Sequence, residues 1–314
     1  MSQAAKPQRS RVPWALAAVV GLCSGLAGYV IHAARVNRIP KQVVQVERLT
    51  DMPGSEETPA ISPDGKAVAF VAAVGGKRQI WIVQLAGGPP RAITKDDADH
   101  YGPRWSADSK SLIYLASYLG SNAIWETPAA GGMARMLVDA VAPGDLSHDG
   151  KSLAFFRLRD GSAELTIADR NGSNPRIVTK TPGVGIYSNL RWDLSDQKLA
   201  YQEGRNLFVS GISGGEQVRA AIGDAPVAGF AWAPDNAGLI VSSSRDTSGP
   251  LVYNLWLIPR KEGSLPSQLT FGELSYATPD ISSAGGSMVV SRAFVPPSGS
   301  MAEADIVMFS GLKW

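Results

Sequence analysis

One segment of the chain has the spacing of a catalytic nucleophile. Gly211-Ile212-Ser213-Gly214-Gly215 matches the G-x-S-x-G pattern of a nucleophile elbow, in which a serine attacks an acyl group. Such an elbow needs a strand-to-helix turn, and an acid and a histidine follow it along the chain. The three histidines of the sequence are His32, His100 and His148, and all of them precede Ser213. We therefore interpret the segment as a turn between two strands, and we predict no catalytic residue.

An acidic cluster is the second candidate for chemistry. Asp96, Asp97 and Asp99 come just before His100, and carboxylate oxygens are the preferred ligands of hard cations. The spacing does not match an EF-hand loop. A solvated acidic loop before a strand accounts for these residues, so we predict no metal site and no cofactor.

Charged side chains also recur at one position of a repeated pattern. The residues directly before the large apolar residue of each repeat are Ala60, Arg104, Asp145, Arg191, Ala231 and Asp280. A few residues earlier, on loops expected at the same channel mouth, stand Glu57, His100, Tyr101, Tyr187 and Tyr276. The charged and aromatic members of both groups are the candidate binding residues.

Two interpretations of the charged ring remain open. Arg and Asp alternate in three consecutive repeats, so these residues can form ion pairs between neighbouring blades. They can instead form the polar mouth of a channel that receives a ligand or a peptide, because Arg and Tyr are frequent anchors of binding sites.

These positions depend on six copies of one short pattern. Each copy has a large apolar residue, then a turn and then an apolar strand, as in Ile61-Ser62-Pro63-Asp64-Gly65 followed by Ala67-Val68-Ala69-Phe70. The apolar residues are Ile61, Trp105, Leu146, Trp192, Trp232 and Ile281. Their spacings of 44, 41, 46, 40 and 49 residues are typical of propeller blades. We predict an all-β fold, a six-bladed β-propeller of four-stranded blades, in which the tryptophans serve core packing.

The sixth repeat lacks its outer strand. It ends with Asp305-Ile306-Val307-Met308-Phe309, whereas Val46-Glu47-Arg48-Leu49-Thr50 resembles an outer strand but precedes the first inner strand. Pairing of these two segments would close the ring and remove its exposed edges. We therefore predict that residues 46–314 form one propeller, closed by the strand 46–50.

The N-terminal segment has the composition of a membrane anchor. Residues 12–34 contain no Asp, Glu, Lys or Arg, and this stretch is long enough to span a bilayer. A cleaved signal peptide is the alternative, but the stretch exceeds the usual signal core and no Ala-x-Ala site follows it. We predict a basic tail over 1–13, one transmembrane helix over 14–34 and a linker over 35–45.

The charge distribution bears on location and partners. Residues 1–41 hold six Lys or Arg and no acid, which leaves 24 basic and 28 acidic residues in 42–314. A mildly acidic domain argues against nucleic-acid binding. Because a short basic tail is easier to retain than to translocate, we expect a single-pass protein of the bacterial inner membrane with its propeller outside the cytoplasm. The small residues Gly21 and Gly25 would allow two anchors to pair as a dimer.

The repeat resembles that of a known family. The run Thr58-Pro59-Ala60-Ile61-Ser62-Pro63-Asp64-Gly65-Lys66, followed by an apolar strand and then Gln79-Ile80-Trp81, is similar to the repeat of TolB-type propellers. Trp105-Ser106-Ala107-Asp108-Ser109-Lys110 and Trp232-Ala233-Pro234-Asp235 carry the same pattern. The resemblance covers about residues 46–314 and implies a propeller that binds protein partners at the cell envelope. The expected anchor stands where TolB has an α/β domain.

Taken together, these features predict a membrane-anchored, non-enzymatic propeller that binds a protein or a small ligand at its channel mouth. One alternative is a propeller hydrolase that acts at the same mouth. Another is the sensory ectodomain of a regulatory membrane protein. No paired-carboxylate, metal or triad arrangement in the sequence favours the hydrolase.

Overall fold

The computed structural model describes residues 44–312, except for 119, 183–186, 216, 221–222, 224, 245–251, 261–262, 283–285 and 295–302. The predicted tail and transmembrane anchor, and the linker up to residue 43, lie outside the described residues. Within the described ranges, the regular secondary structure consists of strands, and no helix there is both long enough and apolar enough to cross a membrane.

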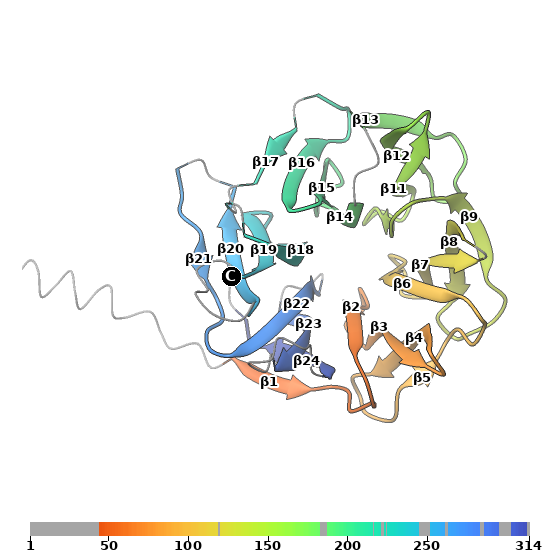
Figure 1. The fold of residues 1–314 in the computed structure, drawn as a ribbon. Helices are drawn as coiled ribbons and strands as arrows, with labels where there is room; N and C mark the ends of the chain where they lie inside the picture. The colour runs from red at the N-terminus through yellow and green to blue at the C-terminus, as the bar shows by residue number, and fades with distance from the viewer. Residues whose placement is uncertain are drawn as a thin grey trace, which may run out of the picture. The chain divides into compact units, whose positions relative to one another are not determined.

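Six antiparallel, four-stranded sheets form the blades of a propeller around a common axis (Figure 1). Blade 1 comprises β2 (Glu56–Ile61), β3 (Ala67–Val74), β4 (Lys77–Gln84) and β5 (Arg91–Ala92). Blade 2 comprises β6 (Asp99–Trp105), β7 (Ser111–Tyr118), β8 (Ser121–Pro128) and β9 (Arg135–Asp139). Blade 3 comprises β10 (Asp145–Leu146), β11 (Ser152–Arg159), β12 (Ser162–Asp169) and β13 (Arg176–Pro182).

The remaining blades follow in chain order. Blade 4 comprises β14 (Tyr187–Trp192), β15 (Lys198–Glu203), β16 (Asn206–Gly211) and β17 (Val218–Arg219). Blade 5 comprises β18 (Val227–Trp232), β19 (Gly238–Ser243), β20 (Asn254–Pro259) and β21 (Ser267–Gln268). Blade 6 comprises β22 (Leu274–Ile281), β23 (Ser287–Phe294), β24 (Ala304–Ser310) and β1 (Gln45–Arg48). The predicted fold class, an all-β propeller of six four-stranded blades, is confirmed.

The core lies between the blades. Because successive side chains of a strand point to opposite faces, each blade supplies apolar residues to both of its neighbours. In β7, Leu112 and Tyr114 pack in the cluster shared with blade 1, whereas Ile113 and Leu115 pack in the cluster shared with blade 3. Six such clusters join the six blades, so burial of apolar surface holds the ring together.

Strand β1 completes the last blade. It pairs antiparallel with β24, so that Val46 lies opposite Phe309 and Arg48 opposite Val307. The Arg48 guanidinium also contacts the carboxylate of Asp305 at 2.7 Å. The pairing predicted between these two segments is therefore present, and the first strand of the domain closes the ring.

Several inner strands include residues that the sequence places on the loops before them. Five of the inner strands contain a β-bulge, and in three of these a proline occupies the irregular position: Pro59, Pro103 and Pro279. Proline is tolerated inside a strand at a bulge, where no ladder hydrogen bond is lost. Gly102 shows the geometry, because its φ is +54° and an added Cβ would lie 2.7 Å from Pro143. Residues expected on loops before these prolines lie in strands instead.

Candidate functional site

A pocket of about 540 Å³ lies on the propeller axis, and all six blades contribute to it. It is at the end of the channel where each inner strand turns into the second strand, because turn residues such as Asp64, Ser109 and His148 line it. We call it the axial pocket. The six residues of the predicted ring, Ala60, Arg104, Asp145, Arg191, Ala231 and Asp280, all line this pocket.

The other candidate residues lie nearer the opposite end of the inner strands, and Glu57, His100, Tyr101 and Tyr276 do not line the axial pocket. Glu57 is half-exposed and lies 3.7 Å from Arg78, whose guanidinium stands over the ring of Tyr101. Tyr276 is buried against Phe309. Tyr187 pairs with Glu203 at the start of β14. The structure therefore brings together the charged ring residues and separates them from these earlier positions.

His100 is fully buried at the start of β6, in contact with the ring of Tyr114. Its Nε2 lies 3.1 Å from the carboxylate of Asp96, which also accepts a hydrogen bond from the hydroxyl of Tyr118. Burial lowers the pKa of His100, although the nearby carboxylates of Asp96 and Asp99 oppose this shift. His100 thus belongs to a buried network of blade 2 and is not at a channel mouth.

The two aspartates of the ring each join neighbouring blades. Asp145 of blade 3 accepts a hydrogen bond from the backbone N–H of Trp192 in blade 4, at 2.9 Å. Asp280 of blade 6 accepts one from the backbone N–H of Ile61 in blade 1, also at 2.9 Å. Burial raises the pKa of Asp145 to about 6 and also raises that of Asp280, while the positive charge of Arg104 opposes both shifts.

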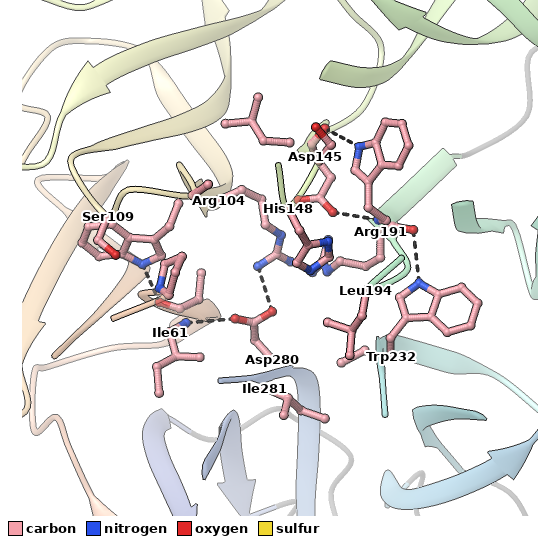
Figure 2. Close-up of a pocket in the computed structure, with 18 of the residues that line it drawn as sticks. Ile61, Arg104, Ser109, Asp145, His148, Arg191, Leu194, Trp232, Asp280 and Ile281 are labelled. Atoms are coloured by element: carbon pink, nitrogen blue, oxygen red, sulfur yellow. Dashed lines mark hydrogen bonds and ion pairs between the residues drawn. The ribbon is translucent and has the colours of Figure 1, made fainter. Parts of the chain in front are cut away.

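The two arginines of the ring have donors without acceptors. Both side chains are more than nine-tenths buried, and Figure 2 shows both pointing into the middle of the axial pocket. Arg104 Nη1 lies 3.6 Å from Asp280 Oδ1, which makes an ion pair but is too long for a hydrogen bond. Arg191 Nη1 donates only to the carbonyl of Leu190. Among the described residues, Nε and Nη1 of Arg104 and Nε of Arg191 find no hydrogen-bond acceptor.

The ion pairs differ from those that the sequence suggests. The ion pair of Arg104 joins blade 2 to blade 6, which are not neighbours, whereas the expected pairs joined consecutive blades. Neighbouring blades are joined instead by the tryptophans, whose indole N–H groups donate to the backbone carbonyl of a ring residue in the preceding blade. Trp105 donates to Ala60, Trp192 to Asp145 and Trp232 to Arg191, at 2.9 to 3.3 Å. These tryptophans are packed as predicted, and they also line the axial pocket.

Sequence reasoning did not include the turn residues of the pocket. His148 stands on the turn after β10, and its side chain is 41% exposed. The carboxylate of Asp196 in the next blade accepts hydrogen bonds from the backbone N–H groups of His148 and Asp149, and it also contacts His148 Nδ1 at 3.0 Å. The repeat does indicate the turn residues. Each turn comes directly after an inner strand with its ring residue, so the turn must lie at the same end of the channel.

The two motifs that first suggested chemistry have structural roles. Gly211 ends β16, and the N–H of Gly214 donates to its carbonyl at 3.0 Å, so Ser213 lies in a turn between strands as predicted. In the acidic cluster, Asp96 contacts His100 and Tyr118, and Asp99 accepts from the backbone N–H of Arg78. Asp99 and His100 lie in β6 itself and not in the loop before it.

The fold and its pocket define a class: a six-bladed β-propeller with a polar site on its axis. Comparison with protein families specifies it further. The family model PD40, described as "TolB beta propeller domain", matches residues 35–184. The match agrees with the resemblance of the repeats to those of TolB-type propellers. No curated protein matches the sequence.

Several solved structures share the six-bladed fold. TolB from Acinetobacter baumannii superposes with a TM-score of 0.58 and 15% identity, over 83% of this chain and 64% of the TolB chain. An oligogalacturonate lyase from Vibrio parahaemolyticus has a TM-score of 0.55 and 10% identity, over 86% of this chain and 94% of the lyase chain. The PQQ-bound aldose sugar dehydrogenase from Streptomyces coelicolor has a TM-score of 0.57 and 13% identity, over 87% of this chain and 99% of the dehydrogenase chain.

These similarities concern the fold alone. The chain spans less than two thirds of the TolB structure, and the neighbours are described by different activities. A propeller hosts many functions, so the function has to be argued from the site.

Proposed function

We propose that this protein is a membrane-anchored, non-enzymatic binding module of the bacterial cell envelope, and that its axial pocket holds a protein partner or a ligand. The observation that carries the proposal is the pair of buried arginines with unused donors. Burying a charged donor without an acceptor is costly, and native proteins rarely do so. A bound group that accepts these hydrogen bonds accounts for their presence.

The environment of the pocket's nucleophiles supports binding over catalysis. Ser109 Oγ accepts from the backbone N–H of Asp64, and Ser147 Oγ donates to Asp149. The base in the pocket, His148, contacts Asp196 and not either serine. A nucleophile within hydrogen-bond reach of a base is the first requirement of covalent catalysis. Neither of these pocket serines is paired with the imidazole of His148 among the described residues.

The proposed location rests on the sequence and on the type of fold. The uncharged stretch 12–34 supports an anchor. Residues 35–184 match the TolB propeller family model, and the resemblance of the repeat implies binding of protein partners at the envelope.

Photo-crosslinking in living cells tests the proposal. A photoreactive amino acid replaces His148, whose side chain lies at the pocket and is partly exposed. The control position is Lys77, an exposed residue at the hairpin between β3 and β4, at the opposite end of its blade. We expect discrete adducts from position 148 and none from position 77. The proposal fails if position 148 gives no adduct in folded protein, or if both positions give the same adducts.

A further inference from the structure

We infer that the group bound in the axial pocket is a single carboxylate attached to an apolar body, held by Arg104 and Arg191. The inference rests on the proposed function, because it names the chemistry that the same pocket recognises. Three features of the pocket carry it: its unused donors, its charge balance and the apolar residues of its wall.

The unused donors call for a group that only accepts hydrogen bonds. Arg104 offers Nε and Nη1, and Arg191 offers Nε, to the space between them. An ionised carboxylate has two oxygens with about four acceptor sites and no donor, and it pairs with a guanidinium through two parallel bonds. An amide or a hydroxyl would bring donors of its own into a site already rich in donors.

The charge balance favours one negative charge. Asp145 and Asp280 face the same pocket as Arg104 and Arg191, and each uses its Oδ2 to bind a backbone N–H of the next blade. These aspartates cannot easily move away from the arginines or leave the site. The two positive and two formal negative charges of the ring nearly cancel, and the exposed turn residues Asp64 and Asp108 add two more carboxylates to the lining, so a dianion such as sulfate would be repelled by the carboxylates. A monoanion can use the free donors with less repulsion.

The rest of the wall combines polar turn residues, such as Ser109 and His148, with a set of apolar residues. The side chains of Ile61, Trp105, Leu146, Leu194 and Ile281 line the pocket beside the charged ring. A volume of about 540 Å³ is within the range of sites that hold small organic ligands. An acid with an apolar body would bury that body against these residues while its carboxylate reaches the arginines. A free organic acid and the C-terminal residue of a polypeptide share this chemistry.

The test measures probe binding to the full-length protein by calorimetry and by tryptophan fluorescence, which reports on Trp105, Trp192 and Trp232 in the pocket wall. The probes are 3-phenylpropionate and its neutral amide, a short peptide ending in leucine as the free acid and as the amide, and sulfate. The variants are Arg191→Met and Arg191→Lys, with Arg159→Met as control. Arg191 is chosen because it forms no ion pair with an acid among the described residues, and Arg159 is an exposed residue of β11.

We expect at least one acid to bind about tenfold or more tightly than its amide, because charge-assisted hydrogen bonds are lost in the amide. Arg191→Met should weaken binding of the acid by a similar factor. Arg191→Lys should weaken it by less, and Arg159→Met should not change it. Binding of phenylpropionate alone identifies a free organic acid as the source, and binding of the peptide acid identifies a polypeptide C-terminus.

Three results would overturn the inference: equal affinity for acid and amide, preference for sulfate over both acids, or no binding of either acid at millimolar concentration. The comparison of acid with amide in the wild-type protein decides the question even if Arg191→Met fails to fold. If position 148 gives adducts but the protein shows no preference for acids, the proposed binding function stands. Only the inference that the ligand is a carboxylate is then refuted.

Discussion

Asp145 combines a structural and an electrostatic role in one side chain. Its carboxylate accepts a hydrogen bond from the backbone N–H of Trp192, and the positive charge of Arg104 is close enough to stabilise its negative charge. Burial still dominates and raises its pKa to about 6, above the value near 3.9 of an unfolded chain. The folded state therefore binds the proton more tightly than the unfolded state. The contribution of Asp145 to stability is fully present below pH 4 and is lost as the pH rises to about 6.

Asp145→Asn isolates this contribution, because asparagine keeps an oxygen for the N–H of Trp192 but does not titrate. We expect the stability of the variant relative to wild type to improve between pH 4 and pH 7.5 by an amount of the order of 2 kcal/mol. Urea unfolding at both pH values measures the difference. A stability difference that does not change with pH would show that burial does not perturb Asp145.

At the scale of the element, the inner strands show what the sequence can and cannot predict. The spacing of the anchors from Ile61 to Ile281 predicts six blades, because each blade repeats the same hydrophobic alternation. Glu57, His100 and Tyr276 were expected on loops before the inner strands, but bulges at Pro59, Pro103 and Pro279 allow the strands to include them. A bulge depends on contacts such as Gly102 against Pro143 in the next blade, which no local pattern reveals.

The candidate site, like the inner strands, was predictable from the sequence only in part. Ring positions such as Arg104 and Arg191 follow from the period, since every blade presents the same strand to the axis. Most hydrogen bonds of the ring join residues 41 to 47 positions apart, and the one between Asp280 and Ile61 joins residues 219 positions apart. The place of His148 beside the ring also follows from the period, because its turn comes directly after an inner strand, whereas the presence of a pocket at this end of the channel does not.

Glu56 connects the closing strand to both blades that meet there. Its side chain is fully buried and accepts hydrogen bonds from the hydroxyl of Thr50 and from the backbone N–H groups of Met52 and Ile306. Glu56→Gln replaces one accepting oxygen with a donor that faces another donor. Although burial raises the pKa of Glu56, we expect the variant to lose about 1 to 3 kcal/mol of stability at pH 7, measured by urea unfolding.

Glu57→Gln is the matched control for Glu56→Gln. Glu57 is half-exposed and forms only a distant pair with Arg78, at 3.7 Å. Such surface pairs contribute between about 0 and 1 kcal/mol. Equal stability of the two variants would show that the buried carboxylate does not hold the closure.

For the whole molecule, the proposed topology gives a direct prediction. If residues 14–34 anchor the protein and the propeller lies outside the cytoplasm, protease added to spheroplasts should remove the propeller and leave a cytoplasmic marker protein intact. Immunoblotting of the domain before and after permeabilisation measures this. Protection in intact spheroplasts with loss only after lysis would place the propeller in the cytoplasm. A mature protein that begins near Arg35 would show that the segment is a cleaved signal peptide.

The closure of the ring by β1 sets the order of events during synthesis. Arg48 emerges from the ribosome 257 residues before its partner Asp305, a delay of roughly 13 to 50 s at ordinary translation rates. During that time β1 has no strand to pair with, and its polar residues Gln45, Glu47 and Arg48 disfavour pairing with other chains. The propeller can reach its native state only when almost all of its chain has been made, so a stalled or truncated chain leaves an open ring for the cell's proteases to remove.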